Sequence, residues 1–141
     1  MLKKFAVILS SIIVICSVQY FPNRPLFYEF IDGKSGYEIY LENYSSSADI
    51  VTLSGINTYT TLSNISGESC RIGGHVTKDD IFNRFNAQLV LVEKHEGGTS
   101  YYAYAQIIKY KATVQGKTVN LHVFVGENGI KVGSPIIFGS F

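Results

Sequence analysis

Alternation of apolar and polar residues constrains this chain more than any other feature of its sequence. From Tyr37 onward, short segments place apolar side chains at every second position; in YEIYLE (37–42), Tyr37, Ile39 and Leu41 share one side. Turn-forming stretches separate these segments, and the chain contains 13 glycines. A period of two residues belongs to a strand with two unlike faces. Most of the chain is therefore predicted to form a sheet.

The expected strands cover residues 37–42, 49–53, 58–66, 68–72, 87–95, 99–110, 111–125 with a turn at 115–117, and 130–141. The last of these is interrupted by Gly133, Ser134 and Pro135. A proline there predicts an edge strand or a bulge, because it cannot donate to the ladder of a central strand. The apolar tail Ile136–Phe138 is expected to insert beside the preceding strands and to offer a docking edge to a partner.

One segment of the body reads as a helix, TKDDIFNRFNA (77–87). Thr77 suits the N-cap, and Asp80 stands where a capping box needs its carboxylate. Ile81, Phe82 and Phe85 form the apolar stripe that packs on a sheet. The predicted fold class is α+β, a twisted antiparallel sheet with the helix from Thr77 to Asn86 packed on one face, behind an N-terminal membrane or signal helix.

The N-terminus carries an export signal. Lys3 and Lys4 precede a run from Phe5 to Phe21 that contains no charge. Residues 1–22 are predicted to be a signal peptide or an N-terminal membrane anchor. The two lysines keep the N-terminus inside, so the body lies outside, at the cell membrane or secreted after cleavage.

A short juxtamembrane stalk is expected at residues 23–36, and a single α+β domain at 37–141. Pro22 just before the stalk and Pro25 within it keep the chain extended, and the stalk contains an apolar patch that can dock on the body. That patch consists of Leu26, Phe27 and Phe30.

Charge argues against nucleic-acid binding. The chain has 12 Lys and Arg against 11 Asp and Glu, and Lys3 and Lys4 belong to the N-terminal segment. Without those two lysines, 10 basic residues remain against 11 acidic ones, so the body has no excess of positive charge for binding nucleic acid.

The residues give little support to catalysis or metal binding. His75, His95 and His122 are far apart and show no metal-ligand spacing, and Cys16 and Cys70 form no paired motif. We expect no cofactor, no metal and no catalytic residues. His122 is expected on a wet face or under the helix. Glu93 and His95 share one face of a strand, which leaves a proton-transfer pair as an alternative to a solvated hairpin tip.

Tyrosines supply the candidate binding site. Tyr101, Tyr102, Tyr104 and Tyr110 crowd one predicted hairpin. Tyrosine rows stack sugars or contact peptides, although cross-strand packing explains the same pattern. With Ile136 and Phe138 of the tail, these tyrosines form the predicted ligand or partner site.

The C-terminal half resembles the YwmB-type family of bacterial exported proteins. The resemblance rests on SYYAYAQIIKY (100–110), GKTVNLHVFV (116–125) and VGSPIIFGSF (132–141), and it covers roughly residues 77–141. It implies a fold like that of the TATA-box-binding protein. It implies no established activity, no catalytic residues and no DNA binding.

These observations predict an extracytoplasmic envelope protein that is not an enzyme and that binds a protein partner or a cell-wall polymer. Two alternatives stay open. One is an envelope hydrolase that uses Glu93 and His95. The other is a structural domain that helps a membrane complex to assemble.

Overall fold

The computed structural model describes residues 24–31, 36–42, 49–53 and 62–138. The predicted signal or anchor at residues 1–22 lies outside these ranges. Within them, no helix has the length and apolar character needed to cross a membrane.

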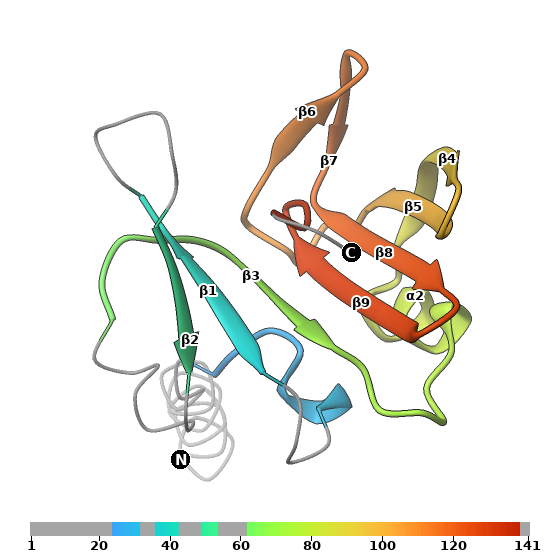
Figure 1. Cartoon of the computed structure of the whole chain (residues 1–141). Coiled ribbons are helices and arrows are strands. Elements are labelled where there is room, and N and C mark those ends of the chain that lie inside the picture. Colours follow the sequence, from blue (N-terminus) through green and yellow to red (C-terminus); the bar gives the residue numbers. More distant parts are fainter. Residues whose placement is uncertain (1–23, 32–35, 43–48, 54–61, 139–141) are drawn as a thin grey trace, which may run out of the picture.

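Seven strands form one antiparallel sheet in the order β2-β1-β3-β9-β8-β5-β4 (Figure 1). Their bounds are β1 (Tyr37–Leu41), β2 (Asp49–Leu53), β3 (Ile65–Arg71), β4 (Gln88–His95), β5 (Gly98–Tyr104), β8 (Leu121–Gly126) and β9 (Gly129–Ser134). A separate hairpin of β6 (Ala112–Val114) and β7 (Lys117–Val119) projects away from the sheet. The predicted α+β class with an antiparallel sheet is confirmed.

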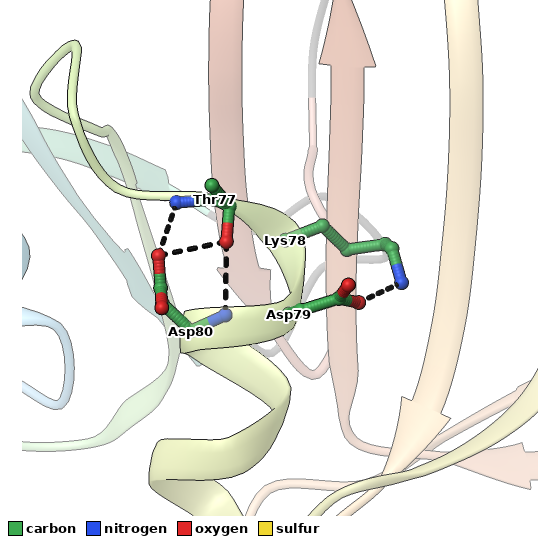
Figure 2. A network of polar contacts seen from close by, with 4 residues as sticks. All are labelled: Thr77, Lys78, Asp79 and Asp80. Carbon is green, nitrogen blue, oxygen red and sulfur yellow. Dashed lines mark hydrogen bonds and ion pairs between the residues drawn. The ribbon is translucent and has the colours of Figure 1, made fainter.

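One α-helix, α2 (Lys78–Phe85), is present in the described ranges, besides a single 3-10 turn, η1 (Tyr28–Phe30). Figure 2 shows why α2 begins where it does. The Asp80 amide donates to Thr77 Oγ1 at 3.2 Å, and the Thr77 amide donates back to Asp80 Oδ2 at 2.8 Å. Asn86 ends the helix in the left-handed region with φ 48°. The predicted helix and its capping box are confirmed.

The helix covers one face of the sheet. Ile81 and Phe85 of α2 lie in a buried cluster with Ala103, Leu121, Val123 and Val132 from the sheet. Strand alternation places these sheet residues on a common face, which we call the helix face. Burial of this apolar surface is the main source of stability for the domain.

Residues 24–31 complete this core. Phe27 is fully buried, and its ring meets Phe85 edge to face at 5.7 Å between centroids. Leu26 and Phe30 pack against the same cluster. The apolar patch expected in the stalk therefore docks on the body.

A buried carboxylate holds that segment in place. Glu68 of β3 is fully buried and accepts hydrogen bonds from the Leu26 amide and, at 2.6 Å, from the Tyr37 hydroxyl. The Phe27 amide donates to the same hydroxyl at 3.0 Å. Burial raises the pKa of Tyr37 far above its usual range, and the neighbouring Glu68 raises it further. The hydroxyl therefore keeps its proton and remains a donor to Glu68.

The predicted edge strand at the C-terminus is wrong. β9 lies between β3 and β8 and is paired on both sides, so the free edges of the seven-stranded sheet are β2 and β4. β9 ends at Ser134, and Pro135 comes after the ladder rather than inside it. The glycine at 133 has a different role from the one predicted, because it lets the tail pack closely against β9. A Cβ at this position would lie 2.8 Å from Ile137 Cγ1.

Residues 135–138, which we call the tail, cover the face opposite the helix. Ile137 is 6 % exposed and lies over Gly133. Phe138 packs edge to face on Tyr40, with ring centroids 4.7 Å apart. Tyr40 alternates with Tyr37, Ile39 and Leu41 and therefore lies on the other face of β1, where it is fully buried. Because α2 covers the first face and the tail covers part of the second, the centre of the sheet is buried on both sides.

The expected strand at 99–110 is shorter than predicted. β5 ends at Tyr104, and residues 105–108 turn away. The buried Asn120 side chain fixes this turn: it accepts from the Ala105 amide at 2.7 Å and donates to the Ala105 and Ile108 carbonyls at 2.7 and 2.9 Å. These contacts leave Ile107 at the surface, 67 % exposed.

Candidate functional site

The predicted tyrosine site does not form one row. Strand alternation in β5 places Tyr101 on the helix face and Tyr102 and Tyr104 on the opposite face. Tyr110 lies beyond the end of β5, in the segment before β6. The four rings therefore cannot act together as a single stacking platform.

Tyr102 is a packing residue. Its ring is 8 % exposed and stacks on His122, with centroids 4.3 Å apart and planes inclined by 24°. Its hydroxyl donates to Glu93 Oε2 at 3.0 Å. Burial raises the pKa of Tyr102, and the hydrogen bond to Glu93 raises it further.

Lysine ammonium groups lie over the rings of the other three tyrosines. The distances from Nζ to the ring centroid are 5.0 Å for Lys78 and Tyr101, 5.7 Å for Lys111 and Tyr104, and 5.3 Å for Lys109 and Tyr110. Such cation–π contacts occupy the ring faces that a sugar would need. This arrangement favours packing over glycan stacking.

An apolar patch lies on the free edge of the sheet. Leu89 and Val92 of β4 are 54 % and 42 % exposed. Val92 stands opposite Tyr101 in the ladder, and Leu89 stands opposite Ala103, so both side chains point to the helix face beside α2. We call Leu89, Val92 and Tyr101 the β4 patch. The sequence signal for it was the apolar run QLVLVEKH, which fits a strand with apolar residues on both faces.

Two features of β4 act against pairing with a second β4. A bulge interrupts its register between Leu89 and Leu91. Lys94 is exposed on the same strand. Bulges and charges on edge strands are devices that limit indiscriminate edge-to-edge association.

A hydrogen-bonded chain of three residues crosses β4, β5 and β8. Ser100 Oγ lies 3.0 Å from His95 Nε2 and 3.0 Å from His122 Nε2. Ser100 and His122 are almost fully buried, whereas His95 is exposed. We call these residues the His95–Ser100–His122 chain. His122 was expected on a wet face or under the helix; it is buried on the opposite face because the tail covers it.

The tail sets the protonation state of His122. The Ile137 amide donates to His122 Nδ1 at 3.1 Å, so Nδ1 carries a lone pair and Nε2 carries the proton. Burial lowers the pKa of His122 to about 4, and the neighbouring His95 lowers it further. His122 is therefore neutral at physiological pH.

The predicted tail residues lie together with this chain. The Phe138 amide donates to the Tyr40 hydroxyl at 3.1 Å, and the Phe138 side chain is 38 % exposed. Ile136 is half-buried. The structure thus brings the tail to His122 and Tyr40, and it leaves the β4 patch at a separate place on the sheet.

Glu93 and His95, the residues of the hydrolase alternative, each have partners of their own. Glu93 accepts from the Tyr102 hydroxyl and, at 2.5 Å, from Gln115 Nε2. His95 contacts Ser100, whose hydroxyl is fully buried and therefore out of reach of a substrate. His95 also borders an open pocket between the β4–β5 and β8–β9 turns, which includes Glu96, Gly98 and Glu127.

The described ranges contain no group of three or more His, Cys, Asp or Glu side chains placed to hold a metal ion. Cys70 is a buried free thiol. Burial raises the pKa of the Cys70 thiol well above its usual range, and the nearby Glu68 adds to the effect. A protonated, buried thiol is a packing residue rather than a nucleophile.

No protein-family model, curated protein or solved structure matches the chain. The resemblance to the YwmB-type family stays a prediction.

Proposed function

We propose that the protein is an exported, non-enzymatic envelope domain that binds a protein partner through the β4 patch. Export rests on the uncharged N-terminal run after Lys3 and Lys4. The observation that carries the binding function is the exposure of Leu89 and Val92 on a free sheet edge.

A free edge fits a protein partner better than a cell-wall glycan. An extended segment of another protein adds to a sheet edge through main-chain hydrogen bonds, and alternate side chains fill apolar contacts beside it. Leu89 and Val92 offer such contacts next to the ladder. A glycan requires open aromatic faces, and lysines or His122 lie against those of the four predicted tyrosines.

The partner is expected to be a different protein. The bulge at Leu89–Leu91 breaks the repeat that two copies of β4 would need in order to pair along their length. The regular part of the edge, from Leu91 to His95, remains in register with β5. A partner strand of its own shape can follow this part of the edge.

The test compares three surface variants of the full-length chain in native membranes. Val92→Glu and Leu89→Glu place a charge in the β4 patch, and Ile107→Glu places one at a more exposed apolar residue elsewhere. A photocrosslinker at residue 94 reports adducts by mass. We expect the yield of a defined protein adduct to fall at least tenfold in the first two variants and to stay unchanged in the third, since a buried charge is strongly disfavoured.

Other outcomes would replace this proposal. An adduct that all three variants retain would exclude the β4 patch as the contact. Loss of a multi-protein membrane complex without a direct adduct at β4 would favour the structural assembly role. A hydrolytic activity abolished by Glu93→Ala with His95→Ala would favour the enzyme.

A further inference from the structure

The two free edges of the sheet differ in how they are protected. β4 has a bulge in its register and the exposed Lys94. β2 makes five consecutive pairs with β1 without a shift of register, and no described strand pairs with its other side. It contains neither proline nor lysine. An edge strand without such devices remains able to pair with another chain.

The sequence around β2 is almost uncharged. Residues 43–67 contain one charged side chain, that of Asp49. Ile50 is 47 % exposed and Thr52 is exposed, both on the face opposite the helix, whereas Val51 stands opposite the buried Ile39 on the helix face. Three consecutive β-branched residues favour an extended backbone. The edge therefore offers main-chain groups and β-branched side chains rather than charges.

We propose that β2 pairs antiparallel with β2 of a second copy of this chain, about a twofold axis at Val51. In this register Val51 stands opposite its own copy, and Ile50 stands opposite Thr52 of the second copy. A twofold axis perpendicular to the sheet keeps the side chains of both strands on their own faces. The exposed Ile50 and Thr52 thereby become cross-strand neighbours, and the interface is the same on both copies.

The charge of Asp49 favours the antiparallel arrangement over a parallel one. Each Asp49 lies two residues from the axis, in opposite directions, so the two carboxylates are about 14 Å apart along the ladder. This separation exceeds the Debye length of about 8 Å at physiological ionic strength. Parallel pairing in register would place each Asp49 directly opposite its copy, where like charges are destabilising.

The occupant that matches this edge is a second copy rather than a foreign strand. A tract with a single charge has little with which to select one foreign partner, whereas a second copy always matches it in length and pattern. The five residues of β2 span about 17 Å. Such a short interface buries less than the roughly 1,200 Å² of a stable complex, so the dimer is weak and reversible. It leaves the β4 patch, at the other end of the sheet, free for its partner.

The first test is disulfide crosslinking of the full-length chain in native membranes, in a Cys16→Ser background. Val51→Cys places two thiols on residues whose Cα atoms are about 4.5–5.5 Å apart in the dimer, within the range of a disulfide. Asp49→Cys is the control, because its thiols are too far apart. Asp49 is more exposed than Val51, so random collision would favour the control. We expect at least tenfold more dimer from Val51→Cys.

Two outcomes of the crosslinking would overturn the proposal. Equal dimer yields at the two positions would indicate collision or a different register. A disulfide between Val51→Cys and another protein, in place of the dimer, would give the edge a different occupant.

The second test needs no cysteine variant, and it decides the question even if Val51→Cys fails to fold. Sedimentation velocity of the full-length protein in detergent micelles should show dimerisation that increases with concentration. Ile50→Lys should weaken the association at least tenfold, because an edge lysine opposes strand pairing. Val92→Lys, at a comparably exposed residue on the other edge, should leave it unchanged. A monomer at every concentration, or equal weakening by both variants, would overturn the proposal, whether or not β4 binds its partner.

Discussion

At the centre of the sheet both faces are buried, but different interactions cover them. The helix face is covered by α2 and residues 24–31, and its core is an apolar cluster with one buried hydrogen-bonded group, formed by Glu68 and Tyr37. The opposite face, which we call the tail face, contains buried polar side chains, Ser100, Tyr102, His122 and Lys131, and hydrogen bonds from the Ile137 and Phe138 amides hold the tail on it. Apolar burial has no direction and is indifferent to pH, whereas a chain of hydrogen bonds has both a direction and a protonation state. The domain therefore combines a permanent face with a conditional one.

The largest effect should come from the helix face. Phe27→Ala removes a fully buried ring that packs on Phe85. The free energy of unfolding should fall by about 3–5 kcal/mol, as for other buried aromatic truncations. Urea unfolding of the full-length chain in mild detergent measures it. Tyr28→Ala, at a neighbour that is 45 % exposed, is the control and should change stability far less. Equal effects would mean that residues 24–31 are not part of the core.

The tail face should respond to acid. Below pH 6.5 the unfolded chain takes up a proton at His122, which the folded form accepts only near pH 4. A depressed histidine pKa makes the folded state lose stability as the pH falls through this window, here by about 3 kcal/mol. His122→Asn keeps an acceptor for Ile137 without a titrating group. The difference between the two unfolding curves isolates His122 from the carboxylates, and identical pH slopes would contradict the prediction.

A smaller effect is expected where the tail meets Tyr40. Tyr40→Phe keeps the ring that packs on Phe138 and removes the hydroxyl that accepts from its amide. Stability should fall by about 1 kcal/mol, the net value of one hydrogen bond. Amide exchange at Phe138 should accelerate in parallel. Tyr28→Phe, at an exposed ring, should alter neither measurement.

An effect of similar size is expected at the start of α2. Thr77→Ala removes the side-chain half of the capping box and should cost about 1 kcal/mol. Thr77→Ser keeps the side-chain oxygen and should therefore retain most of this stability. The hydrogen bond from Thr77 also lowers the pKa of Asp80. A chemical-shift titration of Asp80 should therefore move toward the ordinary value in the alanine variant.

The strands, the helix and its cap followed from local patterns. The period of two predicted most of the sheet, and the sequence from Thr77 to Asn86 contained its own start and stop signals. The sequence also predicted that Phe27 can dock on the body, because an apolar patch next to a small sheet is stabilised by burial. The candidate site could be predicted less well from the sequence. Tyr101 and Tyr102 are adjacent in sequence, and alternation sends them to opposite faces.

The sequence by itself determined which segments become strands and which becomes a helix, because these choices depend on side chains a few residues apart. Only the tertiary structure decided that β9 is central, that β4 is an edge, and that the tail covers His122 and Tyr40. Strand order depends on contacts between distant residues, such as the 98 positions that separate Tyr40 from Phe138. A proline after Ser134 looks the same in sequence whether the strand before it is an edge or a centre. The difference lies in what pairs on each side of the strand, and that is a property of the folded chain.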